Sequence, residues 1–332
     1  MEIKRLSRTE EQMYMAGRGK GGKAMVTAVI VAVVLLVLLA AGSWLLANYV
    51  LTGRRQTLEE ARAWQEEHYD FSFYDIIEKT DYTVTSDDGY MLHAQFLRNP
   101  AGGNRYMLMT HGYTDNRLGM MKYVRIFLDQ GFHVIVYDLR GHGMNEPALC
   151  TYSMLERKDL LAMIRDSRER YPEMEIFGLH GESLGAATSV AVLQEKPPLD
   201  FVIADCGFSE ILPVIQGLLK GMHVPSFMAE AASIWAKIRT GWSFREMRPI
   251  DSLRDNEIPL LFIHGETDSL IPPEHSLRMK EATRGYAELL LFPGAGHASC
   301  VFADPERYAE TVRAFVKKVI AGEKSPEGYR EP

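Results

Sequence analysis

Three residues in the second half of the chain have the types and order of a nucleophilic catalytic site: Ser183, Asp268 and His297. Ser183 is the centre of Gly-Glu-Ser-Leu-Gly at residues 181–185, which fits the Gly-x-Ser-x-Gly pattern of a nucleophile elbow. A serine hydroxyl is a poor nucleophile until a base takes its proton. A histidine that is oriented by a carboxylate is such a base, so the sequence predicts a Ser183–His297–Asp268 triad that works through an acyl-enzyme.

The neighbours of the pentapeptide support this interpretation, because so short a pattern also recurs by chance. Residues 175–180 are a short apolar segment typical of a strand, and residues 186–193 begin with small side chains that let a helix pack close to a sheet. A sharp turn between strand and helix would hold the Ser183 hydroxyl out at the edge of the sheet.

Asp268 and His297 each follow another apolar run typical of a buried strand. The two runs are residues 260–264 and 288–292. Because functional groups of open α/β sheets gather at the carboxyl ends of the strands, we expect both residues on the same edge as Ser183. Glu266 and Asp205 are alternative acids, since Glu266 belongs to the same loop as Asp268 and Asp205 ends a strand.

The tetrahedral intermediate of acyl transfer needs two hydrogen-bond donors for its oxyanion. We expect one from the backbone N–H of Leu184, which follows the nucleophile, and the other from the N–H of Tyr113, in the loop after an early strand. Three further histidines precede glycines at strand ends and are expected to be packed and structural: His111, His180 and His264. No residues have metal-ligand spacing and no phosphate-binding or dinucleotide motif is found, so neither a metal nor a cofactor is predicted.

The charge distribution argues against nucleic acid as a partner. Residues 1–55 carry eight Lys or Arg and three Glu, whereas residues 56–332 carry 29 basic and 41 acidic residues. An acidic globular part lacks the basic surface that phosphate binding requires. The three cysteines are odd in number and are expected to be small buried side chains rather than a disulfide scaffold: Cys150, Cys206 and Cys300. The sequence leaves open a single disulfide between two of them.

An uncharged segment from residue 24 to residue 53 predicts a membrane anchor, because about 20 apolar residues suffice to cross a bilayer. Six Lys or Arg precede it within residues 1–23, and the positive-inside rule leaves this basic segment in the cytoplasm and the rest of the chain outside. A cleaved signal peptide is the alternative, with small residues at 40–43 as the cleavage site, but the apolar segment exceeds the usual length of about 7–15 residues.

The remaining chain is expected to contain one α/β domain. Residues 54–80 are charged and read as a stalk or first helix, and residues 81–322 alternate apolar strands with helices, which indicates a mostly parallel sheet covered on both faces. A hairpin is expected around Asp87-Asp88-Gly89. Residues 209–252 interrupt the alternation and read as a helical cap, and residues 323–332 read as a disordered tail. The cap carries bulky side chains expected to be exposed: Met222, Phe227, Met228, Trp235, Trp242 and Phe244.

Over residues 82–319 the chain resembles the α/β-hydrolase superfamily, and within it the bacterial membrane-anchored Bem46-like and serine-aminopeptidase-like hydrolases. The motifs that carry the resemblance are His111-Gly112-Tyr113, Asp138-Leu139-Arg140-Gly141-His142-Gly143, residues 181–185, His264-Gly265-Glu266-Thr267-Asp268 and Gly296-His297. The resemblance implies an eight-stranded, mostly parallel sheet with a cap inserted before the strand that carries the acid. Met144 stands where many relatives carry serine.

The function expected from these observations is a membrane-tethered, extracytoplasmic serine hydrolase of carboxylesterase or lipase type, which acts on a small-molecule ester or acyl substrate. A peptidase or an acyltransferase could use the same triad, since these differ only in the molecule that receives the acyl group. A non-catalytic binding protein that keeps the fold is a further alternative.

Overall fold

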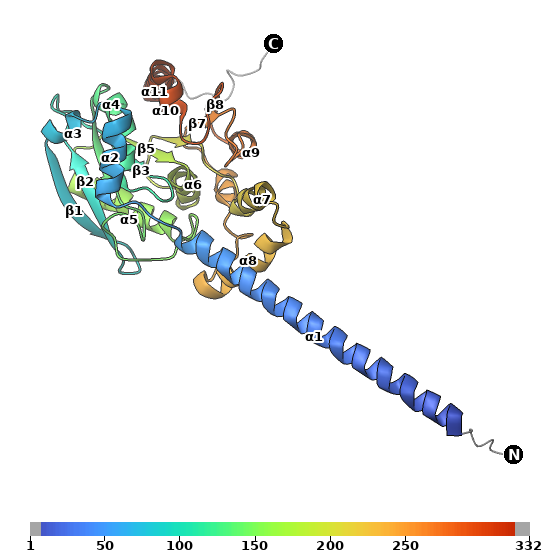
Figure 1. The fold of residues 1–332 in the computed structure, drawn as a ribbon. Coiled ribbons are helices and arrows are strands. Elements are labelled where there is room, and N and C mark those ends of the chain that lie inside the picture. Colours follow the sequence, from blue (N-terminus) through green and yellow to red (C-terminus); the bar gives the residue numbers. More distant parts are fainter. Residues whose placement is uncertain (1–7, 323–332) are drawn as a thin grey trace, which may run out of the picture.

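The structure, a computed structural model, describes residues 8–322, without the side chains of residues 10–22 and 24. The expected disordered tail and the first seven residues lie outside this range. Within it, eight strands form one sheet in the order β1-β2-β4-β3-β5-β6-β7-β8 (Figure 1). The strands are β1 Lys79–Thr85, β2 Met91–Leu97, β3 Arg105–Thr110, β4 Phe132–Tyr137, β5 Ile176–Glu182, β6 Phe201–Asp205, β7 Leu260–Gly265 and β8 Ala287–Phe292.

Pairing within the sheet confirms the mostly parallel arrangement. β1 and β2 form the expected antiparallel hairpin, and β2 also pairs antiparallel with β4. All later neighbours are parallel: β4 with β3, β3 with β5, and onward through β6 and β7 to β8. Strands β3, β4, β5, β6 and β7 are almost entirely buried, as their continuous apolar runs predict.

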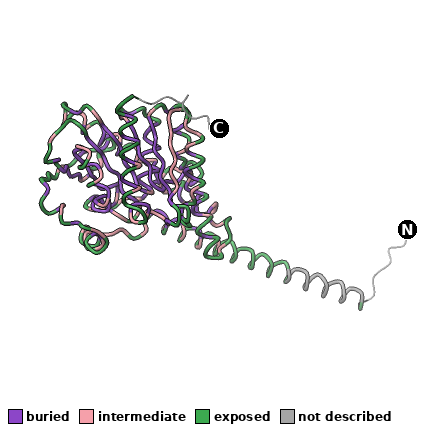
Figure 2. The backbone as a smooth tube through the Cα atoms, turned by 90° about the horizontal axis from the view of Figure 1, so that it is seen from above, coloured by how far each residue is buried: buried purple, intermediate pink, exposed green. Residues whose placement is uncertain are grey.

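Helices cover both faces of the sheet and enclose two apolar cores. One core receives side chains from α5, α6, α7, α8 and α9, and the other from α2, α3, α4, α10 and α11. Figure 2 shows the buried strands as a continuous purple centre between the two layers. The helices are α2 Leu58–His68, α3 Phe73–Ile76, α4 Met121–Leu128, α5 Glu156–Arg170, α6 Leu184–Ala191, α7 Ile211–Gly221, α8 Phe227–Thr240, α9 Glu274–Ala282, α10 Cys300–Ala303 and α11 Pro305–Ile320, with 3₁₀ turns η1 Arg117–Met120, η2 Val192–Glu195 and η3 Pro249–Leu253.

The segment between β6 and β7 is helical, with α7 and α8 followed by η3. Its bulky side chains divide between surface and interior. Met222 and Phe227 are exposed as expected, whereas Phe244 is fully buried, so its expected exposure is wrong. The Phe244 N–H donates to the Ser233 hydroxyl at 2.9 Å, which holds the return from α8 against the helix.

The first helix, α1, runs from Arg8 to Thr52 and projects far from the globular body (Figure 1). Its part Met25–Thr52 is the one helix within the described residues that is long and apolar enough to cross a membrane.

The last turns of α1 are packed into the globular body. Ala47 and Leu51 are fully buried, Val50 nearly so, and the Cys150 N–H donates to the Leu51 carbonyl at 2.9 Å. Because these residues recur at helical spacing, they form one face that packs against the domain. The sequence did not indicate this, since the apolar segment looks the same throughout. The three cysteines are buried and unpaired, as expected.

The buried end of α1 should contribute to folding stability. We predict that Leu51→Ala lowers the free energy of unfolding by about 2–5 kcal/mol, the usual cost of truncating a fully buried leucine. Leu45→Ala is the matched control on the same helix, because Leu45 is 60% exposed and contributes little to the core. Denaturant titration of both variants of the full chain in detergent measures the difference, and equal midpoints would contradict the packing role of Leu51.

Candidate functional site

Ser183 lies in a strained turn between β5 and α6, as the elbow pattern predicts. Its φ of 54° and ψ of −113° are rarely adopted by a residue with a side chain. Two glycines make the turn sterically possible. A Cβ at Gly181 would lie 2.3 Å from the Gly185 carbonyl oxygen, and a Cβ at Gly185 would lie 1.9 Å from that of Thr110 in β3. The hydroxyl of Ser183 is thus held at the carboxyl edge of the sheet.

The structure brings the three predicted residues into one hydrogen-bonded chain. The Ser183 Oγ lies 2.9 Å from His297 Nε2, and His297 Nδ1 lies 2.7 Å from Asp268 Oδ2. The loops that carry the acid and the histidine are tied together, because both the backbone N–H and the hydroxyl of Thr267 donate to the Ala295 carbonyl at 3.0 and 2.9 Å. This geometry suits an imidazole that is protonated at Nδ1 and accepts the serine proton at Nε2.

Asp268 is buried, but several hydrogen-bond donors surround its carboxylate. Its Oδ1 accepts the backbone N–H groups of Leu270 and Ile271 at 2.9 and 2.8 Å, and its Oδ2 lies 3.2 Å from His264 Nε2. Burial by itself would raise the pKa of this carboxyl, but the hydrogen bonds from His264, His297 and Ile271 outweigh it and hold the pKa well below the usual range. Asp268 therefore stays ionised beside His297.

The contact of His264 with the acid was not anticipated from the sequence, which indicated only a packed strand-end histidine. His264 is fully buried, with Nδ1 2.7 Å from the Ser276 hydroxyl and Nε2 2.7 Å from the Ile271 carbonyl. Since Nε2 faces two acceptors, it carries the proton and donates toward Asp268 as well as Ile271. The spacing of four residues between His264 and Asp268 is the only sequence signal for this pair.

A cleft of about 290 Å³ opens over Ser183 and His297. The two predicted oxyanion donors, Tyr113 and Leu184, flank the nucleophile, and neither backbone N–H has an acceptor among residues 8–322. Leu184 is the first residue of α6, where N–H groups lack partners within the helix. Other residues of the cleft wall are Gln56, Trp64, Asp115, Lys122, Glu182 and Phe302.

The loop that presents Tyr113 is tied to the end of α1 and the linker after it. The Tyr113 hydroxyl accepts the Gly53 N–H at 2.8 Å and donates to the Val50 carbonyl at 2.9 Å. The Gln56 N–H donates to the Thr114 carbonyl at 2.7 Å. A predicted oxyanion donor is therefore positioned by the segment that was expected to be only anchor and stalk.

The alternative acids do not reach the histidine ring. Glu266 is exposed, and the Asp205 carboxylate accepts the hydroxyls of Tyr308 and Tyr123 at 2.9 and 3.3 Å. Burial raises the pKa of Asp205 to about 6, and the nearby Glu182 carboxylate adds to the effect. Its function in this arrangement is to join two helices through tyrosine hydroxyls, not to orient His297.

Glu182, directly before the nucleophile, forms an ion pair with Lys122 at 2.5 Å, and both side chains are buried. The Tyr123 hydroxyl donates to the same carboxylate oxygen of Glu182 at 2.6 Å. A buried carboxylate without a partner would be costly, so Lys122 is needed to neutralise the negative charge beside Ser183.

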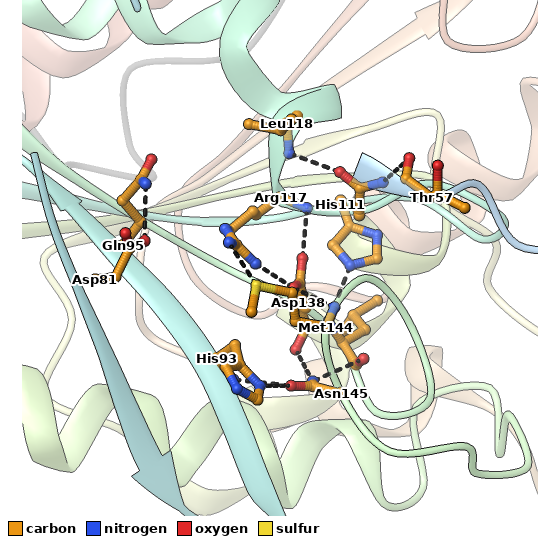
Figure 3. Close-up of polar contacts among 12 residues, drawn as sticks. Thr57, Asp81, His93, Gln95, His111, Arg117, Leu118, Asp138, Met144 and Asn145 are labelled. Atoms are coloured by element: carbon orange, nitrogen blue, oxygen red, sulfur yellow. Dashed lines mark hydrogen bonds and ion pairs between the residues drawn. The ribbon is translucent and has the colours of Figure 1, made fainter. Parts of the chain in front are cut away.

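Polar contacts of Asp138 and its neighbours tie the Asp138–Gly143 turn to other segments of the fold (Figure 3). The Asp138 carboxylate accepts the backbone N–H of Arg117 at 2.8 Å and that of Met144 at 3.0 Å, and it also pairs with the Arg117 guanidinium. Asn145 donates to the Asp138 carbonyl at 2.7 Å and accepts the His93 N–H at 2.8 Å. The turn thereby joins the ends of β2 and β4 to the segment after the Tyr113 loop.

Two of the strand-end histidines are packed away from the cleft. His111 Nε2 accepts the Leu139 N–H at 2.9 Å, and His180 Nε2 lies 3.0 Å from the Tyr308 hydroxyl. Both rings are fully buried, and burial lowers their pKa values, that of His180 to about 3. Both are therefore neutral, structural side chains.

Among the side chains that the structure describes, one group has the donor types of a metal site. Cys206, Asp268 and His297 each offer a ligand atom, and these atoms lie within 4.8 Å of one another. Burial raises the pKa of the Cys206 thiol well above its normal value, which disfavours the thiolate that metals require. The facing atoms of Asp268 and His297 are also already engaged with each other. The chemistry of the group fits hydrogen-bonded hydrolytic residues better than metal ligands.

Comparison with known proteins agrees with the fold. The family model described as serine aminopeptidase, S33, matches residues 104–257, and a model described as TAP-like protein matches residues 227–319. YqkD of Bacillus subtilis (strain 168) is 29% identical over 276 residues, which is 81% of this chain and 90% of that protein. The human protein ABHD12B is 25% identical over 239 residues, 65% of this chain and 61% of that protein.

Among solved structures, the esterase Pf2001 of Pyrococcus furiosus has the same fold, with a TM-score of 0.62 at 23% identity. The alignment covers 75% of this chain and 95% of the esterase. The mostly parallel sheet, the helical layers and the matching family models establish the fold class that the motifs predicted. The chain belongs to the α/β-hydrolase superfamily and has a serine-aminopeptidase-like sequence.

Proposed function

We propose that this hydrolase is a membrane-anchored serine esterase that works through an acyl-enzyme at Ser183. The observation that carries the proposal is the hydrogen-bonded chain from the Ser183 hydroxyl through His297 to Asp268, at a strained elbow. In this arrangement His297 Nε2 takes the proton as Ser183 Oγ attacks the substrate carbonyl, and then returns it to the leaving alcohol. In the second half of the reaction water attacks the acyl-enzyme. His297 Nε2 takes a proton from this water and then returns it to Ser183 Oγ as the acid product leaves.

Asp268 and the two backbone donors would lower the barrier by fixed electrostatics. The ionised Asp268 holds the Nδ1–H tautomer of His297 and stabilises the imidazolium that forms during attack. The N–H groups of Leu184 and Tyr113 would donate to the oxyanion, and losing one such donor typically costs about 10²–10³ in rate.

The substrate class is proposed as an ester because solved structures with this fold include esterases. The cleft wall combines the aromatic side chains of Trp64 and Phe302 with the charged Asp115, Lys122 and Glu182.

A peptidase remains the second candidate, because one matching family is described as serine aminopeptidase. A panel of acyl esters and aminoacyl amides with the same fluorogenic leaving group separates the two, and faster turnover of the amides would favour the peptidase.

The proposed anchor is the apolar part of α1, Met25–Thr52. We propose that the N-terminal basic segment lies in the cytoplasm and the hydrolase domain outside, since cytoplasmic flanks are rich in Lys and Arg. Protease protection in sealed cells checks this orientation, because the hydrolase domain should be degraded without lysis.

Replacement of the nucleophile should abolish turnover. We predict that Ser183→Ala lowers kcat by about 10⁶-fold, the scale known for triad nucleophiles. Fluorophosphonate labelling of the full chain should disappear in this variant and persist in Ser226→Ala, which changes an exposed serine before α8. Retention of more than about a tenth of the activity would refute the nucleophile, and a folded wild type that is never labelled would favour a binding protein.

The acid can be identified by comparing two buried aspartates. Asp268→Asn should lower kcat by about 10⁴-fold, because the amide favours the wrong histidine tautomer while leaving the geometry intact. Asp205→Asn should retain most of the activity, since its oxygen can still accept from Tyr308. Steady-state kinetics on one ester substrate measures both, and a greater loss in Asp205→Asn would reverse the assignment.

A further inference from the structure

Helix α8 carries an apolar stripe that faces away from the domain. Phe227, Ile234 and Ile238 are 57%, 63% and 67% exposed. Their spacings of seven and four residues place them on one face of the helix. The opposite face packs inward through Ala229, Ala232 and Ala236, all fully buried. A contiguous patch of exposed apolar side chains can mark a surface that contacts another protein or a membrane.

The stripe lies on a helix that runs alongside α1 where α1 enters the domain (Figure 1). Three residue pairs join the helices: Gly42 with Met228, Ser43 with Trp235 and Asn48 with Arg239. The Met228 methyl lies 3.3 Å from where a Cβ on Gly42 would stand, and Trp235 Nε1 donates to Ser43 Oγ at 3.1 Å. In these pairs a higher residue number in α1 goes with a higher residue number in α8, so the two helices run in the same direction. The Phe227 end of α8 therefore points toward the apolar, projecting part of α1.

The depth of this contact follows from the length of α1. A helix rises 1.5 Å per residue, so a hydrocarbon core of about 30 Å takes about 20 residues. Counted from Met25, the core ends near Trp44, and the contact with α8 begins at Gly42. The exposed aromatic rings of Trp44 and Tyr49 stand at this level, where such rings favour the membrane interface.

We propose that the Phe227–Ile234–Ile238 stripe of α8 inserts into the membrane interface next to α1, so that the cap is a second membrane contact. The inference rests on the membrane anchoring proposed above. A bilayer is the favoured occupant because the stripe continues the exposed apolar surface of α1, which hydrocarbon must cover once α1 spans the membrane. An amphipathic helix with its apolar face in the interface and its polar face in water is a stable arrangement.

The charges of α8 fit this orientation. Lys237 pairs with Glu246, and Glu230 pairs with Arg245, so the acidic and basic groups that flank the stripe are neutralised within the domain. Arg239, bonded to Asn48, lies at the end of α8 that is farther from the projecting part of α1. The apolar end would therefore be deeper and the basic end closer to water.

Depth-dependent fluorescence quenching tests the inference in the full-length protein. Single cysteines at Ile234→Cys, Leu36→Cys and Ile76→Cys carry an environment-sensitive dye in phosphatidylcholine vesicles with spin-labelled acyl chains. Leu36, in the apolar part of α1, reports the anchor. Ile76 is the matched control, an 87% exposed isoleucine in α3. The native cysteines are buried and should not react, which the labelled wild type verifies.

We expect strong quenching at position 36, quenching at position 234 of at least half that extent, and none at position 76. Phe227→Cys should be quenched more than Ile238→Cys, because the Phe227 end is deeper. Quenching at 36 without quenching at 234 would overturn the cap contact while leaving the anchor. No quenching at either would overturn the anchor as well. A blue-shifted but unquenched dye at 234 would mean that protein, such as a second copy of the chain, covers the stripe, and would also overturn the proposal.

Discussion

The close approach of α6 to β3 is the constraint on which the site depends. At Gly185 the two elements are so near that a single methyl group would collide with the Thr110 carbonyl. This approach brings the N-terminus of α6, with the Leu184 N–H, beside the loop that follows β3 and carries the Tyr113 N–H. The short distance between α6 and β3 also explains the strained Ser183 backbone, because the chain must turn from strand β5 into helix α6 within one residue. Folding of the sheet and helix layers supplies the free energy that holds this strain.

Two similarly buried aspartates show how nearby hydrogen-bond donors determine whether a carboxyl group stays ionised. Asp205 and Asp268 both end up buried at the same edge of the sheet, but their pKa values shift in opposite directions. Asp205 receives only tyrosine hydroxyls and lies near the Glu182 carboxylate, so burial prevails and its pKa rises to about 6. Asp268 receives two backbone N–H groups and two imidazoles, so its charge is retained. Only the second arrangement can stabilise an imidazolium beside Ser183.

Much of this could be predicted from the sequence, because the controlling patterns are local. Continuous apolar runs identified the buried strands, and the elbow pattern led to Ser183. The structure brings Asp268 and His297 to it, since each follows a parallel strand. What could not be predicted depends on contacts between distant segments. The partnership of His264 with Asp268 requires the fold of the loop, and the burial of Phe244 requires the return of the chain against α8.

The end of α1 was hidden from sequence analysis for a physical reason. Hydropathy measures only the tendency to leave water, so it does not distinguish a helix surface that faces lipid from one that faces a protein core. The structure shows that the end of α1 faces the protein, because the Val50 carbonyl accepts hydrogen bonds from the hydroxyls of Tyr113 and Tyr152. A chain that began at Arg54 would lack both hydrogen-bond partners of the Tyr113 hydroxyl, the Val50 carbonyl in α1 and the Gly53 N–H just after it. It would also expose the apolar side chains that Ala47 and Leu51 now cover. The segment that would hold the protein in a membrane thus also supports, through its last turn and Gly53, the loop of a proposed oxyanion donor.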